Sequence, residues 1–173
     1  MHEVEDLWST TLPMIACIFE SLGFPEPDRQ IEVCVFPPEY RLGAAETVRG
    51  LILFGQPPRS PSFASAVIAH ELSHILITRL AGLREWAVDE TICLLVEDLV
   101  YRRRDSTTAS RIWRVEELDA PHALALRAEE KLYHELTESP GLVLADLPDL
   151  VRSFLSDEER ALHPPRGLLR NLT

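Results

Sequence analysis

The sequence predicts an α+β fold in which a helix and two strands precede a buried helix, a second helix and a helical extension. Two stretches rich in β-branched residues indicate the strands, and longer stretches with an apolar residue every three or four positions indicate the helices. A chain of 173 residues is long enough for one domain with a hydrophobic core and too short for two ordinary domains. We therefore expect one compact domain, with residues 1–105 as its core and residues 106–173 as a helical extension packed on that core.

The first expected helix covers residues 1–22, where apolar side chains recur at helical spacing until Gly23 ends the pattern. Two strands are expected next, at residues 31–36 and 47–55, because paired prolines follow each stretch closely. The residues between these strands predict either a short third strand or a loop.

The next expected helix spans residues 61–80, with Ser60 as its N-cap and a proline at its first position. Its apolar residues occupy almost every side, as they do in a helix that lies inside a molecule. Further helices are expected from about residue 85 to 104, from 120 to 138 and from about 146 to 155.

Composition and charge exclude several classes of function. A formal net charge of −11 opposes broad nucleic-acid binding, because phosphates require a basic surface. No apolar run approaches the ~20 residues of a spanning helix, and the acidic first residues do not resemble a secretory signal. The three cysteines are widely spaced and odd in number, so they imply no disulfide framework. We expect a cytoplasmic protein that binds neither nucleic acid nor a membrane, whereas the sequence leaves the oligomeric state open.

His70, Glu71 and His74 form an HExxH motif in the middle of the expected buried helix. Residues at positions i and i+4 project from one face of a helix, so both imidazoles can reach a single Zn²⁺ ion. Glu71 leans toward the same edge, where it can hold the metal-bound water and take its proton without ligating the metal. The metal lowers the pKa of that water toward ~7. The motif thus predicts hydrolytic chemistry with Glu71 as the catalytic base.

The surroundings of the motif favour a metal site over a coincidence. Residues 67–76 contain no charged side chain outside the motif itself, whereas a chance motif on a solvated face would have charged neighbours. The competing interpretation is a metal-free pair of core histidines with Glu71 as their hydrogen-bond partner. Burying two histidines and a carboxylate is costly without compensation, and a metal ion would supply that compensation.

Residues 67–76 resemble the active-site helix of the zincin (HExxH) zinc metallopeptidases. The order of elements in residues 1–105 is similar to the compact gluzincin-like core and to the phage-repressor-cleaving ImmA/IrrE family. This resemblance implies a zincin-like core with an N-terminal helix, a small β-sheet, an active-site helix and a second ligand helix. It further implies Zn²⁺ as the cofactor and hydrolysis of peptide bonds in a protein or peptide substrate. By the same resemblance, the substrate would pair as an added strand with residues 48–54.

The third metal ligand is expected on the helix that follows the motif, where the gluzincins carry a glutamate. Two antiparallel helices with a short connection bring residues at similar distances from the turn into register. This register places Glu90 opposite His74. Glu85, Asp89 and Glu97 remain alternative ligands, and Asp89 or Glu97 is expected to supply the carboxylate that orients a ligand histidine.

An oxyanion-stabilising histidine or tyrosine is expected near the metal. The candidates are Tyr101, Tyr133, His122, His134 and His163, and the sequence does not choose among them. The principal alternative function is a zincin-like protein-binding module, or a latent protease with no constitutive activity, in which the C-terminal helices cover the cleft. The substrate, the cleavage site and any regulation are not fixed by the sequence.

Overall fold

The computed structural model describes residues 2–23, 32–35, 44–46, 51–54, 61–81, 85–104, 113, 115, 118–138, 141 and 146–162. These residues form five helices and three short strands. The helices are α1 (His2–Ser21), α2 (Pro61–Ala81), α3 (Trp86–Arg104), α4 (Ala120–Glu138) and α5 (Leu147–Leu162). The strands are β1 (Glu32–Val35), β2 (Ala44–Glu46) and β3 (Leu51–Phe54).

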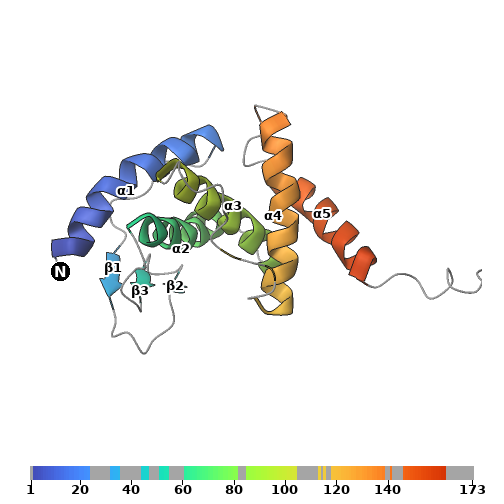
Figure 1. Ribbon diagram of the computed structural model, residues 1–173, viewed down its shortest axis with the longest axis horizontal. Coiled ribbons are helices and arrows are strands. Elements are labelled where there is room, and N and C mark those ends of the chain that lie inside the picture. Colours follow the sequence, from blue (N-terminus) through green and yellow to red (C-terminus); the bar gives the residue numbers. More distant parts are fainter. Residues whose placement is uncertain are drawn as a thin grey trace, which may run out of the picture.

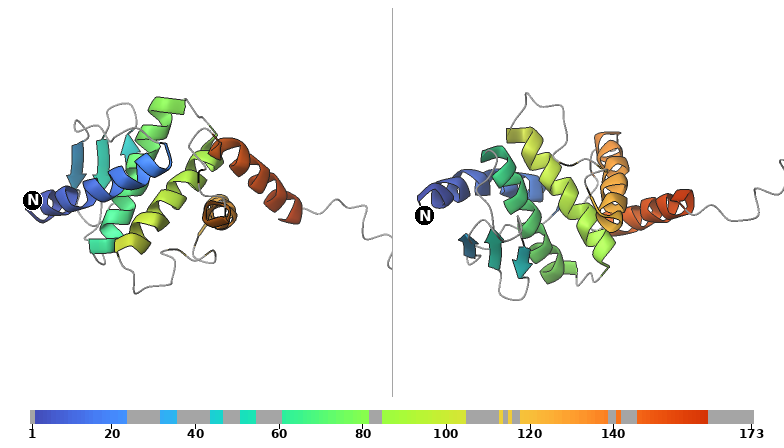
Figure 2. Two further views of the ribbon diagram at one scale, coloured as in Figure 1. Left: turned by 90° about the horizontal axis from the view of Figure 1, so that it is seen from above. Right: turned by 60° about the horizontal axis from the view of Figure 1, so that its bottom comes forward.

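Helix α3 lies at the centre of the helical assembly and contacts each of the other four helices. Its contact with α2 is the most extensive, and the two helices run side by side through the middle of the molecule (Figure 1). Helix α1 packs across α2 and α3, while α4 and α5 lie on the far side of α3 from the strands (Figure 2). The α2–α3 pair is therefore the framework on which the other elements are placed.

A single hydrophobic cluster joins all five helices. Its largest members exclude solvent almost completely, which makes helix-on-helix burial the main source of stabilisation in the described part of the chain. They include Phe19 of α1, Ile68 and Ile75 of α2, Leu95 of α3, Leu132 of α4 and Leu147 of α5. Helix α2 is buried on nearly every side, as its apolar composition predicts.

The three strands form one small sheet in the order β1–β3–β2. Strand β1 pairs with β3 in parallel, with Glu32 opposite Leu51, and β2 pairs with β3 in antiparallel fashion, with Ala44 opposite Leu53. The sheet contacts α2 through β2 and β3. It is a small attachment to the α2 side of the helical assembly.

The expected fold class, an α+β zincin-like core, is corrected by this structure. The described part of the chain is overwhelmingly helical, with helices of 16 to 21 residues against strands of three or four. Prolines and glycines, which weaken strands, border both stretches predicted as strands, and the described strands are three or four residues long. The described hydrophobic cluster consists of helix residues and Leu22, the residue that follows α1. The fold is thus a helical assembly.

The stretch expected to pair with a substrate strand, residues 48–54, is described from residue 51 on, and its pairing with a substrate stays a prediction. Strand β3, at residues 51–54, is the central strand and is hydrogen-bonded to a neighbour on both sides. Strand addition requires a free edge, which β3 does not offer. Residues 48–50 lie outside the described residues.

The expected helices agree closely with the observed ones. Helices α1 to α4 begin and end within about one residue of the predicted limits, and Pro13 lies inside α1. Helix α5 extends to Leu162, seven residues beyond its expected end. None of the described helices combines the length and apolar character that crossing a bilayer requires.

Candidate metal centre

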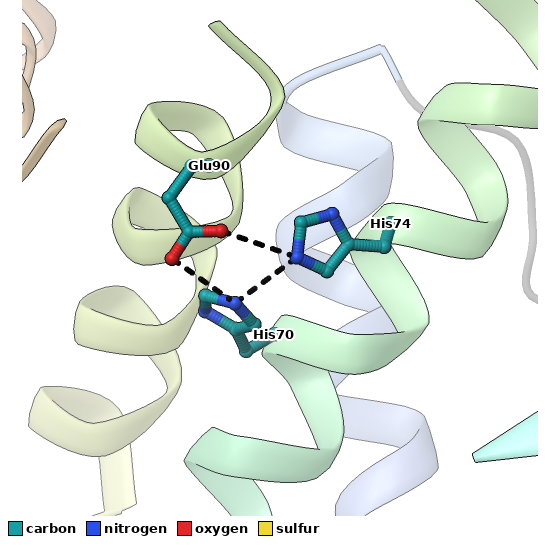
Figure 3. A group of neighbouring side chains, drawn as sticks. All are labelled: His70, His74 and Glu90. Carbon is teal, nitrogen blue, oxygen red and sulfur yellow. Dashed lines mark hydrogen bonds and ion pairs between the residues drawn. The ribbon is translucent and has the colours of Figure 1, made fainter. Parts of the chain in front are cut away.

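Three side chains from the α2–α3 pair converge on one point. His70 and His74 project from α2 and Glu90 from α3, and their potential ligand atoms all lie within 4.8 Å of one another (Figure 3). The two Nε2 atoms are 3.2 Å apart. Glu90 Oε1 lies 3.6 Å from His70 Nε2, and Glu90 Oε2 lies 3.4 Å from His74 Nε2. The three residues predicted as ligands are thus brought together.

These separations fit a tetrahedral metal ion. With metal–nitrogen distances of 2.0–2.1 Å, two ligand atoms of a tetrahedral zinc site lie about 3.3–3.4 Å apart. The 3.2 Å between the two Nε2 atoms is close to that value, and each Nε2 atom lies 3.4–3.6 Å from a different oxygen of Glu90. Two imidazoles and one carboxylate are also a donor set of catalytic zinc sites, in which the fourth position is left to water or substrate. The donor chemistry and the spacing therefore both suit Zn²⁺.

The two histidines are the partly exposed residues in an otherwise buried stretch of α2. From Phe63 to Ile77 every residue of α2 is buried except His70 and His74, whose side chains are 13% and 22% exposed. The four-residue spacing puts both on one face, and that face meets α3. The apolar residues on the other sides of α2 hold this orientation, because rotating the helix would expose them.

His70 is held from behind by a second carboxylate. Its Nδ1 atom lies 3.0 Å from Glu97 Oε2, and the indole N–H of Trp113 donates to Glu97 Oε1 at 3.0 Å. A carboxylate only accepts, so Nδ1 carries the proton and, in the neutral ring, Nε2 presents its lone pair to the point of convergence. Such a carboxylate behind a ligand histidine fixes the tautomer and makes the ligand nitrogen more basic.

Three buried carboxylates surround the two histidines. Glu71, Glu90 and Glu97 are each less than 9% exposed. With neutral imidazoles, this small volume would carry three negative charges, which is costly unless a positive charge is present. A divalent cation between the histidines and Glu90 would supply that charge.

The pKa values of the carboxylates respond to this environment in opposite directions. Burial raises the pKa of Glu71, and the positive charges of His70 and His74 offset this only in part. Burial would also raise the pKa of Glu90, but the hydrogen bond with His74 and the nearby histidine charges lower it overall. Glu90 therefore stays ionised, as a ligand must, while Glu71 is shifted toward the range in which a group exchanges protons near neutral pH.

The pKa of His70 is displaced strongly in the absence of a metal. Burial alone would lower this pKa, but the hydrogen bond to Glu97 and the negative charges of Glu97, Glu90 and Glu71 raise it to about 9. The site thus attracts positive charge, and without a metal a proton on His70 supplies it.

The alternative ligands predicted from the sequence lie elsewhere or have another role. Glu85 is exposed and accepts a hydrogen bond from Arg152 of α5 at 3.1 Å. Asp89 lies outside the converging group; burial raises its pKa to about 6, and its buried Oδ1 has no hydrogen-bond partner. Glu97 contacts the far nitrogen of His70, which is the orienting position expected for Asp89 or Glu97.

Of the five candidates for oxyanion stabilisation, His122 is the one for which a contact with the converging group is described. His122 Nε2 lies 3.8 Å from Glu90 Oε1. The ring of Tyr133 is covered by the guanidinium of Arg102, and His134 pairs with Glu138 on the exposed side of α4. Tyr101 packs against the hydrophobic cluster. His163 lies outside the described residues.

His122 is held by the start of α4. Asp119, directly before the helix, accepts hydrogen bonds from the backbone N–H and from Nδ1 of His122. With Nδ1 protonated toward Asp119, the Nε2 atom faces the metal centre. The Asp119–His122 pair therefore approaches the site from the start of α4, next to Glu90.

Trp113 is the residue at this centre that sequence reasoning missed. It lies between the two helices α3 and α4, in a stretch without helical or strand periodicity, so no sequence pattern marks it. Its ring also packs edge-on against Phe63 of α2, with ring centres 5.8 Å apart. Trp113 was detectable only once the fold had brought it to Glu97.

No family model, curated protein or solved structure matches this chain. Its function must therefore be argued from the chemistry of its own residues.

Proposed function

We propose that this protein is a zinc-dependent metallopeptidase, with His70, His74 and Glu90 as the metal ligands and Glu71 as the general base. The observation that carries the proposal is the convergence of the two HExxH histidines with a buried glutamate of α3, with potential ligand atoms within 4.8 Å of one another. The resemblance of residues 67–76 to the active-site helix of zincin metallopeptidases supports peptide bonds as the substrate. This resemblance concerns the helix alone and does not extend to the fold.

The residues of the site have complementary roles in hydrolysis. A Zn²⁺ ion held by the three ligands would acidify a water molecule and polarise the substrate carbonyl. Glu71 takes a proton from the attacking water and then delivers it to the leaving amine, so a peptide and water give a carboxylate and an amine. The raised pKa of Glu71 suits this exchange. Glu97 and Trp113 keep His70 in the tautomer that presents Nε2.

His122 is the residue suited to stabilise the developing oxyanion. Its Nε2 atom lies 3.8 Å from Glu90 Oε1, and its ring is held by Asp119 through Nδ1. A preorganised donor aimed at developing charge contributes about 10²–10³ in kcat in well-studied hydrolases. Because Nδ1–H is given to Asp119, Nε2 donates only when the ring carries both protons, and His122 is therefore assigned as an imidazolium that donates from Nε2 to the oxyanion.

The proposal is tested by comparing wild-type protein and Glu71→Gln after loading with one equivalent of Zn²⁺. Glu71 does not ligate the metal, so the variant should hold the same amount of zinc and show the same helical circular dichroism. It should nevertheless lose cleavage of an unfolded protein or a peptide library by at least about 100-fold. Cleavage products are identified by mass spectrometry, which also reports the peptide bonds cut.

The matched control is Glu138→Gln, which alters an exposed carboxylate 62% accessible on α4. It lies about 24 Å along the helix from His122, at 1.5 Å per residue, and should leave both zinc content and cleavage unchanged. Equal cleavage by wild type and Glu71→Gln would remove Glu71 from the mechanism. If zinc-loaded wild type cleaves nothing but binds peptides, the chain is a peptide-binding module and not a peptidase.

A further inference from the structure

An exposed tryptophan stands beside the candidate metal centre. Trp86 is the first residue of α3 and is 44% exposed, the one large hydrophobic side chain exposed among the described residues. It precedes the ligand Glu90 by four positions, so the two side chains leave the same face of α3 one turn apart. An isolated exposed apolar side chain needs no explanation in itself. Its position relative to the metal ligands is what distinguishes it.

Trp86 is joined to the centre through His122. The indole packs edge-on against the His122 imidazole, with ring centres 5.0 Å apart and planes at 84°. His122 in turn reaches to 3.8 Å from Glu90 Oε1 and is 43% exposed. The two rings come from different helices, α3 and α4, and both are open to solvent. They form a continuous aromatic surface that starts at the metal ligand and extends outward.

We infer that this Trp86–His122 surface receives a large apolar side chain of the substrate, next to the peptide bond that is cleaved. The inference rests on the proposed function, because it takes the bond to be positioned at His70, His74 and Glu90. His122 Nε2 is 3.8 Å from Glu90 Oε1, and the ring centres of Trp86 and His122 are 5.0 Å apart, so a side chain adjacent to a bond held there can reach both rings. Trp86 is thus a specificity-determining residue, while His122 provides both the rim contact and the polar group nearer the metal.

The size of the expected preference follows from burial. Covering a leucine or phenylalanine side chain is worth about ten- to a hundredfold in affinity over an exposed one. Aromatic side chains provide large contact area at little entropic cost, which is why tryptophan is enriched at binding hot spots. A substrate with glycine at this position would leave the indole exposed, and one with aspartate would desolvate a negative charge against it.

The test begins with zinc-loaded wild-type protein and a peptide library in which one position at a time is randomised. We expect phenylalanine, leucine or methionine to be preferred about ten- to a hundredfold over glycine and aspartate at one position beside the cut bond. Trp86→Ala should remove this preference, and Trp86→Phe should restore most of it. His134→Ala, which alters an exposed histidine elsewhere on α4, is the matched control and should keep the wild-type preference.

A second measurement does not depend on cleavage. Labelled peptides of the preferred and the glycine series are titrated into zinc-loaded Glu71→Gln, with and without Trp86→Ala, and binding is followed by fluorescence anisotropy. The preferred peptide should bind about ten- to a hundredfold more tightly, and only when Trp86 is present. Zinc content is measured in every variant, so that weaker peptide binding caused by loss of bound zinc is not mistaken for loss of the apolar contact.

The outcomes separate this inference from the proposed function. If wild type cleaves peptides and Trp86→Ala retains the same preference, the assignment of Trp86 is wrong while the peptidase assignment stands. If no peptide is cleaved but Glu71→Gln binds apolar peptides through Trp86, the binding surface stands and the peptidase assignment fails. If zinc-loaded protein neither cleaves nor binds peptides, both are overturned.

Discussion

At the scale of single residues, despite burial, which lowers the pKa of the His70 imidazole, the carboxylates around His70 raise this pKa and determine which ring nitrogen is protonated. The proximity of His70 and His74 was predictable because helical periodicity puts them on one face. Glu90 was predicted from the register of two antiparallel helices, with Glu85, Asp89 and Glu97 as alternatives, and the structure places it beside the two histidines. The role of Glu71 stays a prediction.

For the carboxylate that orients a ligand histidine, the sequence left Asp89 and Glu97 as alternatives, and Glu97 is the one in contact with His70. Trp113 was not predictable, since its approach to Glu97 depends on the path of the chain between α3 and α4 and on contact with Phe63.

The raised pKa of His70 predicts that metal binding releases a proton. A metal needs the neutral ring, but below a pKa of about 9 the metal-free ring is protonated. Between the ordinary pKa of 6.5 and about 9, metal affinity should therefore increase about tenfold per pH unit. Calorimetric zinc titrations at pH 7.5, in buffers of different ionisation enthalpy, measure the protons released. We expect about one per zinc from His70, and identical binding enthalpies in all buffers would contradict this.

Glu97→Gln tests the role of the carboxylate behind His70. The side-chain amide oxygen of the variant can still accept a hydrogen bond from His70 Nδ1 but carries no negative charge. His70 Nε2 therefore becomes a weaker metal ligand, and the pKa of the His70 imidazole falls. Loss of such an orienting group typically lowers metal affinity about 10–100-fold, and competition with a zinc-binding dye measures the change. Glu138→Gln is again the control. Unchanged affinity in Glu97→Gln would mean that Glu97 contributes packing only.

At the scale of elements, the α2–α3 pair explains why the ligands meet. Helix α2 has apolar residues on nearly all sides, so it must be covered, and α3 covers the face that carries His70 and His74. The limits of both helices were predictable because long amphipathic or apolar segments have strong periodicity. The strands were less predictable: of the stretches at residues 31–36 and 47–55, the described residues 32–35 and 51–54 pair as β1 and β3. Strand pairing depends on distant partners, which local sequence does not contain.

Leu132→Ala tests whether α4 is part of the same folding unit as the metal-bearing helices. Leu132 is fully buried on α4 and belongs to the cluster that includes α2 and α3. Removing its side chain should lower the free energy of unfolding by about 2–5 kcal/mol. Urea unfolding followed by circular dichroism should still show one transition, at a lower midpoint.

A control at the exposed end of α2 separates this effect from a general loss of helix. Thr78 is exposed, and Thr78→Ala should change the free energy of unfolding by no more than about 0.5 kcal/mol. Two transitions in Leu132→Ala, with only one of them shifted, would show instead that α4 unfolds independently of the α2–α3 pair.

At the scale of the whole molecule, the helical assembly brings the start of α4 to the metal centre. His122 there contacts Glu90, Asp119 and Trp86. The fold class predicted from sequence was wrong because two stretches rich in apolar residues were taken to form a layer, whereas helices supply the described core. The local order of helices was nevertheless sufficient to predict the candidate site. A site built from two adjacent helices depends little on the rest of the fold.

X-ray absorption at the zinc edge, on protein loaded with one equivalent of Zn²⁺, tests the central claim most directly. We predict two imidazole nitrogens at about 2.0–2.1 Å and carboxylate oxygen at about 2.0–2.2 Å, with one imidazole signal lost in His74→Ala. A sulfur neighbour at about 2.3 Å, or a spectrum with only oxygen neighbours as for zinc in water, would contradict a centre formed by His70, His74 and Glu90.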